Sequence, residues 1–196
     1  MRRCFVLLAV FVCLPLFANA QAYIIQVPSG GDIQTAINQA AGIISGPTPS
    51  DVIIEVAPGT YTPSSQLNVN AINSPTYTVT LRGIAGPSAT LIDLTNVAVN
   101  AVRGDRTQNL IVEGFTFRNR SNPFVNFTGR GIFLFNATNI IIQNCHFDTT
   151  QQSIQFSYQG PIGAAMSPQV QVIHNTAVAW KRKGTSLPPD EVVVHE

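Results

Sequence analysis

The stretch Asn109-Leu-Ile-Val-Glu-Gly-Phe-Thr-Phe117 recurs 30 residues later, without a gap, as Asn139-Ile-Ile-Ile-Gln-Asn-Cys-His-Phe147. In both copies, apolar side chains alternate with other residues on either side of a central polar pair. Alternation with a period of two is typical of a β-strand. Glycine or asparagine in the polar pair favours a tight turn, because both tolerate left-handed φ. Each copy therefore predicts a strand, a turn and a second strand.

The same unit recurs upstream and downstream, starting at Val52, Val79 and Val170, so that five successive units have similar length. A third strand is expected after a longer loop, at Gly131-Ile-Phe-Leu-Phe135 and Asn100-Ala-Val-Arg103. One such unit cannot bury its apolar face alone, but stacked units form a continuous core. We therefore predict an all-β fold, a right-handed single-stranded parallel β-helix (a solenoid) of about five coils.

Asn144 and Asn175 fall near the same turn of neighbouring units and are expected to form a hydrogen-bonded amide ladder. Residues 32–41 have a different period. Asp32 is a candidate N-cap, apolar residues follow at helical spacing, and Gly42 is a candidate C-terminal stop. The sequence thus predicts a short N-terminal helix that covers the open end of the stack.

The composition is poor in charge and gives no sign of a highly charged partner. Charged residues make up 11% of the chain, against about 25% in ordinary globular proteins. The formal net charge is +1, which provides no long-range attraction to nucleic acid. Only Cys145 lies outside the first 20 residues, so no internal disulfide is expected in the remaining chain.

Residues 1–20 have the pattern of a secretory signal peptide. Arg2 and Arg3 precede an apolar run, and Ala18-Asn19-Ala20 is a small-x-small cleavage site. The run is shorter than the about 20 residues that a bilayer span needs. We expect an exported protein without a membrane span, located in the periplasm, at the cell surface or outside the cell. The alternative is a buried N-terminal helix or strand.

The predicted β-helix domain covers residues 21–180, and residues 181–196 form a polar, proline-containing tail. The sequence shows no amphipathic cap at this end, and an uncovered stack exposes a strand edge. Three explanations are open: the tail folds over as a cap, the protein self-associates through this end, or the chain is a fragment of a longer β-helix. The small number of coils favours a fragment.

Four segments form a recognisable series: Ile33-Gln-Thr-Ala-Ile-Asn-Gln-Ala-Ala41, Asp51-Val-Ile-Ile-Glu-Val-Ala-Pro-Gly-Thr-Tyr61, Val79-Thr-Leu-Arg-Gly83 and Thr90-Leu-Ile-Asp93. Together they resemble the opening of pectin-lyase-like β-helix proteins. The resemblance runs from about Tyr23 to Val178 and implies the fold rather than one activity. It implies an acidic polysaccharide as partner and, for an enzyme, a polysaccharide lyase. The Asn-Thr-Asp and Gly-His-Gly signatures of polygalacturonases do not occur.

Three residues are candidates for catalysis. Arg118 and Asp148 occupy the same coil position one period apart, where a lyase would use the arginine as a base and the carboxylate to hold calcium. The alternative is an exposed ion pair between coils. His146 is a candidate general base, and the alternative is a surface histidine. The sequence offers no metal site beyond this calcium reading.

Arginine forks suit carboxylated sugars, and Arg103, Arg106, Arg118 and Arg130 are the candidate substrate-binding residues. Their alternative role is loop solubility. The expected function is binding of an acidic polysaccharide, with cleavage by β-elimination left open. A non-catalytic extracellular structural solenoid is the alternative.

Overall fold

The structure of the chain, a computed structural model, describes residues 21–95, 100–119, 130–148, 152–157, 170–178 and 192–193. The predicted signal peptide, residues 1–20, lies outside the described residues, as does the tail apart from residues 192–193. The domain boundaries at residues 20 and 180 therefore stay predictions.

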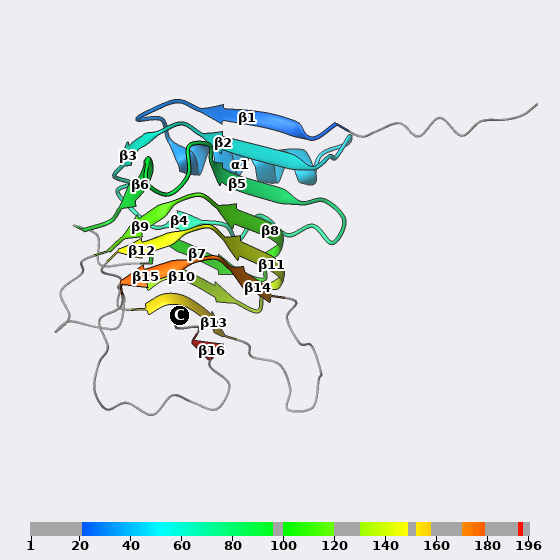
Figure 1. Cartoon of the computed structure of the whole chain (residues 1–196). Coiled ribbons are helices and arrows are strands. Elements are labelled where there is room, and N and C mark those ends of the chain that lie inside the picture. Colours follow the sequence, from blue (N-terminus) through cyan, green and yellow to red (C-terminus); the bar gives the residue numbers. More distant parts are fainter. Residues whose placement is uncertain are drawn as a thin grey trace, which may run out of the picture.

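Three sheets run side by side along one axis (Figure 1). Sheet A has six strands in the spatial order β1 (Tyr23–Val27), β2 (Val52–Val56), β5 (Val79–Gly83), β8 (Gln108–Glu113), β11 (Thr138–Gln143) and β14 (Val170–Ile173). Sheet B consists of β3 (Gly59–Tyr61), β6 (Thr90–Asp93), β9 (Thr116–Arg118), β12 (His146–Asp148) and β15 (Thr176–Val178). Sheet C consists of β4 (Leu67–Asn68), β7 (Val102–Asp105), β10 (Arg130–Phe135), β13 (Gln152–Ser157) and β16 (Val192–Val193).

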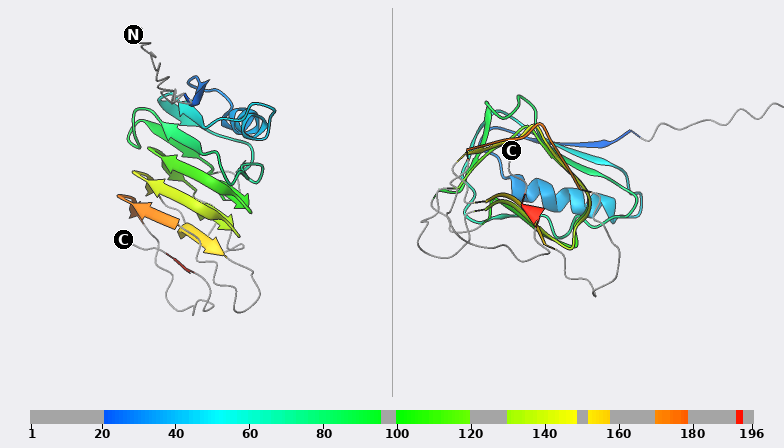
Figure 2. Two further views of the ribbon diagram at one scale, coloured as in Figure 1. Left: turned by 90° about the vertical axis from the view of Figure 1, so that its right-hand side faces the viewer. Right: turned by 60° about the horizontal axis from the view of Figure 1, so that its bottom comes forward.

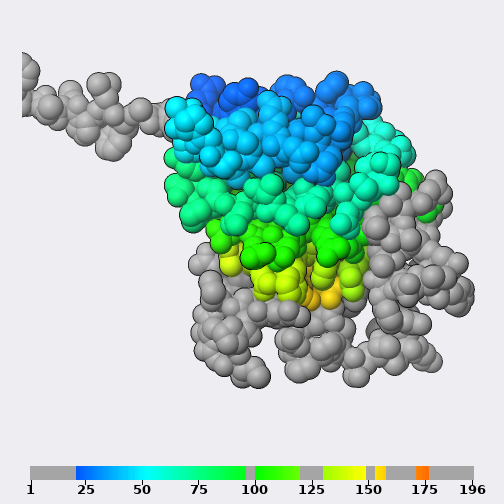
Figure 3. All heavy atoms as spheres, turned by 180° about the vertical axis from the view of Figure 1, so that it is seen from behind, coloured from blue at the N-terminus to red at the C-terminus, as the bar shows by residue number. Residues whose placement is uncertain are grey.

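From β2 to β15 the chain visits the sheets in the order A, B, C and then returns to A, so each strand pairs in parallel with the strand one turn later. Seen along the axis, the coils superimpose around one interior (Figure 2), and from behind they form successive layers (Figure 3). The register joins Val52 to Val79, Val79 to Leu110, Leu110 to Ile140 and Ile140 to Val170. The predicted repeat is therefore the strand register itself, and the parallel solenoid with one N-terminal helix is confirmed.

The core consists of columns of apolar side chains that lie one above another along the axis. On sheet A, the buried column starts at Val52 and continues through Val79, Leu110 and Ile140. On sheet B, Phe117 and Phe147 stack with ring centroids 5.5 Å apart. Burying such large side chains provides most of the free energy that holds neighbouring coils together.

Tight turns link sheet A to sheet B where the polar pairs were predicted. Gly114, Asn144 and His174 adopt left-handed φ values of 77°, 50° and 50° at equivalent positions. Coils come so close here that a Cβ added to Gly83 would collide with the backbone carbonyl of Gly114. Only glycine fits this position without moving the coils apart.

Asn175 does not form the predicted amide ladder with Asn144. The Asn175 side chain accepts a hydrogen bond from the Cys145 backbone (2.9 Å) and donates one to the Ile142 carbonyl (2.9 Å). An amide ladder lies instead at the start of β8 and β11, where Asn139 donates to Asn109 and Asn109 donates to the carbonyl of Ser74. Asn175 satisfies buried backbone groups of the preceding coil, because its side chain points into the turn.

Helix α1 (Ile33–Ile44) lies across the N-terminal end of the stack (Figure 2). Asp32 is its N-cap and accepts a hydrogen bond from the Gln34 backbone (2.9 Å), as predicted. The predicted stop at Gly42 is wrong, since the helix continues to Ile44 and ends at Ser45. Ile44 is buried and extends the apolar face of the helix, and this burial outweighs the low helix propensity of glycine.

Gln34 fastens this helix to the first strand of sheet C. Its side-chain amide donates to the Asn68 carbonyl (3.0 Å), and its carbonyl accepts from the Asn68 backbone N–H (2.7 Å). The amide thus forms the two hydrogen bonds that a further parallel strand would form with β4.

At the other end, β16 pairs with β13 in the antiparallel sense, with Val192 opposite Phe156 and Val193 opposite Gln155. These two residues belong to the predicted polar tail and cover the last edge of sheet C. For this sheet, the pairing agrees with a tail that folds over as a cap. Antiparallel pairing suits a segment that returns to the stack, because it needs no full turn of the solenoid.

Candidate functional site

Arg118 and Asp148, the predicted catalytic pair, lie on the outer face of sheet B at the same position of neighbouring coils. The Nε atom of Arg118 donates to Asp148 Oδ2 at 2.7 Å. A second partner, which was not predicted from the sequence, is Asp93, whose Oδ2 lies 3.4 Å from the Arg118 guanidinium. The offset from Asp93 to Arg118 is 25 residues rather than 30, so the repeat alone did not point to it.

This arrangement keeps the guanidinium charged. The hydrogen bond with Asp148 raises the pKa of Arg118, and the charges of Asp148 and Asp93 act in the same direction. For Asp93, burial acts to raise the pKa, but hydrogen bonds from Thr95 and the charge of Arg118 outweigh burial and lower it. Arg118 is therefore well placed to hold two coils together and poorly placed to accept a proton.

His146 lies two residues before Asp148, on the same outer face of β12. Its Nδ1 atom is 2.8 Å from the Thr176 hydroxyl on β15, the next strand of sheet B. This contact links neighbouring coils, as the Arg118 ion pairs do. The contact with Thr176 fits a surface histidine that links two coils. The role of His146 as a general base stays a prediction.

Calcium, which a lyase reading implies, does not fit these residues as they are arranged. Calcium takes six to eight oxygen ligands, often from several carboxylates. Asp93 and Asp148 both bind the Arg118 guanidinium, which lies between them in the column. Among the described residues, no group of three or more His, Cys, Asp or Glu side chains could hold a metal ion.

Two of the four predicted substrate-binding arginines lie together on sheet C. Arg103 on β7 is exposed and pairs in register with Phe133 on β10. The guanidinium of Arg130 lies over the Phe133 ring, 4.7 Å from its centroid. We call Arg103, Arg130 and Phe133 the sheet C cluster. Phe133 was not predicted as a site residue, and it faces outward because it alternates with the buried Ile132 and Leu134.

The other two arginines do not belong to this cluster. Arg118 lies on sheet B, and Arg106 lies in the turn between β7 and β8 with a left-handed φ of 56°. The Arg106 side chain is 76% exposed, and its Nε is 3.8 Å from Asp105 Oδ1. The four residues are therefore spread over two sheets and a turn. Within the described part of the chain, Arg103 has no carboxylate within ion-pair distance.

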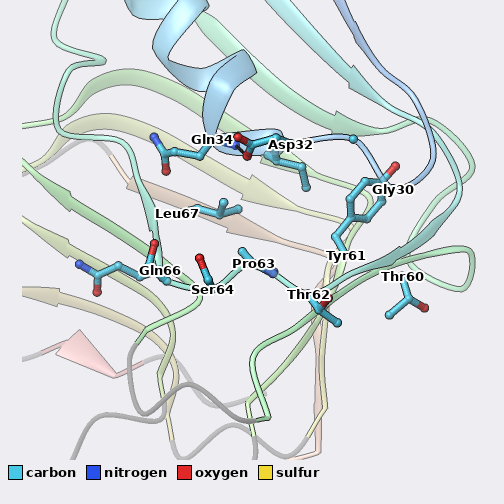
Figure 4. Close-up of a pocket in the computed structure, with 13 residues that line it drawn as sticks. Gly30, Asp32, Gln34, Thr60, Tyr61, Thr62, Pro63, Ser64, Gln66 and Leu67 are labelled. Atoms are coloured by element: carbon cyan, nitrogen blue, oxygen red, sulfur yellow. Dashed lines mark hydrogen bonds between the residues drawn. The ribbon is translucent and has the colours of Figure 1, made fainter.

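A pocket of about 530 Å³ opens where the start of α1 meets the segment from β3 to β4 (Figure 4). Asp32 and Gln34 approach it from the helix, and Thr62, Ser64 and Gln66 approach it from the facing segment. This pocket could not be predicted from the sequence, because its residues are separated along the chain and belong to no repeat. Its volume lies within the range of small-molecule sites.

Within the described residues, no helix has the length and apolarity of a membrane span. No protein-family model, curated protein or solved structure matches this chain.

Proposed function

We propose that this chain is an exported β-solenoid that binds an acidic polysaccharide through the sheet C cluster. The observation that carries the proposal is the pairing of Arg103 and Arg130 with the outward ring of Phe133. Export rests on the signal-peptide pattern of residues 1–20. The pectin-lyase-like resemblance points to the same class of partner.

The chemistry of the cluster suits a carboxylated sugar. A guanidinium binds a carboxylate through two parallel hydrogen bonds, and it is less strongly hydrated than an ammonium group. The Phe133 ring holds the Arg130 guanidinium in a fixed orientation, which reduces the entropy lost on binding. Parallel strands place equivalent side chains at a spacing of about 4.8 Å along the axis, so a linear polymer can contact several rungs.

Binding without cleavage is the version that we favour. β-Elimination needs a base that removes the proton next to the sugar carboxylate, and the best candidate for that role was Arg118. Its raised pKa and its two carboxylate partners oppose loss of its proton. Incubation with pectate, alginate or chondroitin, with calcium present, should therefore release no unsaturated uronide. Release that depends on Arg118 would contradict this version.

The test of binding compares two variants that lose positive charge from two different sheets. Arg103→Gln combined with Arg130→Gln should weaken binding of a galacturonate oligosaccharide by about a hundredfold or more in calorimetry, because each of the two charge-assisted contacts contributes about 1.5–3 kcal/mol. Arg82→Gln is the control, since Arg82 lies on sheet A and pairs with Glu113 and Glu55. It should leave the affinity unchanged.

The second candidate function is a non-catalytic structural solenoid. It is favoured by a polar ladder on the outer face of sheet A, where Arg82 binds Glu55 and Glu113, and Gln26 and Gln143 extend the ladder at either end. Such a ladder holds coils in register and needs no ligand. Full affinity in the double arginine variant, or no binding by the unaltered chain, would favour this function over ours.

A further inference from the structure

The pocket between α1 and the β3–β4 segment combines an apolar floor with a polar rim. Ile33, Tyr61 and Leu67 line it and are buried, so they form its floor. The rim carries hydroxyl and amide groups, contributed by Gln34, Thr62, Ser64, Ser65 and Gln66. A sugar ring has the matching character, since hydroxyl groups surround a carbon skeleton. Sites for small ligands commonly combine apolar walls with a few polar groups.

The charge of the pocket selects against an anion. Of the residues that line it, only Asp32 is charged. Its carboxylate caps α1 through Gln34 and also accepts a hydrogen bond from the Thr35 hydroxyl at 2.6 Å. The helix N-terminus therefore already has its negative partner, and a second carboxylate would be repelled. An uncharged sugar carries no such penalty.

The wall of the pocket is linked to the sheet C cluster through β4. Gln34 in the pocket wall is hydrogen-bonded to the backbone of Asn68 on β4. Asn68 pairs in register with Arg103 on β7, and Arg103 pairs with Phe133 on β10. Neighbouring rungs are about 4.8 Å apart, so Arg103 lies about one rung from the pocket wall. The two hydrogen bonds between Gln34 and Asn68 fix the wall before any ligand arrives.

We propose that this pocket binds an uncharged sugar residue of the same polysaccharide chain whose carboxylated residue binds the sheet C cluster. This inference rests on the proposed function. It narrows the partner to a polymer in which acidic and neutral residues alternate. A polymer made of uronic acid alone would place a carboxylate next to Asp32.

The test compares a hyaluronan tetrasaccharide, in which glucuronate alternates with an uncharged amino sugar, with a galacturonate tetrasaccharide. We expect tighter binding of the alternating ligand by about tenfold, because the pocket supplies a few additional hydrogen bonds. Ser64→Trp fills the pocket from an exposed rim position and should abolish this preference. Ser88→Trp, the same change at an exposed serine outside the pocket, should preserve it.

A second variant tests the charge without blocking the pocket. Asp32→Asn keeps a good N-cap, so the melting temperature should stay close to that of the unaltered chain. Loss of the negative charge should strengthen binding of the galacturonate tetrasaccharide by about threefold. An unchanged affinity for this ligand would contradict the pocket assignment.

The outcomes separate this inference from the proposed function. If Ser64→Trp leaves the preference intact while the double arginine variant loses affinity, the pocket assignment is wrong and the sheet C proposal stands. If the unaltered chain binds neither tetrasaccharide, both proposals are wrong.

Discussion

Replacing Arg118 by Met should destabilise the solenoid at neutral pH, because Asp93 and Asp148 would then lie in one column without their shared cation. The two contacts measure 3.4 and 2.7 Å, and the three side chains are 31%, 20% and 21% exposed. An exposed pair contributes about 0–1 kcal/mol, whereas breaking a fully buried pair costs about 3–5 kcal/mol. For these half-buried groups we expect a loss of about 1–2 kcal/mol.

The assay is chemical denaturation at pH 7 and at pH 3, followed by circular dichroism. The pKa of Asp93 is lowered in the folded chain, so its contribution is present above the unfolded pKa of about 3.9 and is lost as the pH falls through the folded value. The gap between the two chains should therefore shrink from pH 7 to pH 3. Equal stability at pH 7, or a gap that is just as large at pH 3, would refute this reasoning.

Three further predictions concern the core and the turns. Phe147→Ala should cost about 3–5 kcal/mol of unfolding free energy in urea titration, since it removes a fully buried ring, and a loss below 1 kcal/mol would argue against the stacked core. Gly83→Ala should cost about 1–3 kcal/mol of unfolding free energy, because its Cβ collides with Gly114. Gly42→Ala, which has open space around it in α1, should instead stabilise the chain by about 0.5–1 kcal/mol. The opposite order of urea midpoints would contradict the close approach of the coils. Burial raises the pKa of Cys145 to about 12, so in a form whose other two cysteines are serine it should react with a thiol reagent at pH 8 only in denaturant.

The repeat could be predicted from the sequence because each coil needs the same residues at the same places. The offset between Leu110 and Ile140 is the register of β8 and β11, and the alternation around these residues predicted which side chains are buried. Gly114 and Asn144 were recognised as turn residues for the same reason, and both adopt left-handed φ.

The site could be predicted only in part, because its residues come from segments that share no period. Asp93 lies before a loop whose length differs from that of the next coil, so its contact with Arg118 was not visible in the repeat. The pocket needs α1 and the β3–β4 segment, which meet only after the stack has formed. The helix end was misplaced, because the burial of Ile44 depends on the strands beneath it.

Gln34 has a consequence for the growth of the sheets. A parallel solenoid resembles a template, since the free edge of its first strand can recruit a further strand from another molecule. The Gln34 amide already occupies the Asn68 N–H and carbonyl at the edge of β4, and a side chain cannot pass the pairing on to another backbone. At β4, one glutamine thus terminates sheet C as a chain stopper terminates a polymer.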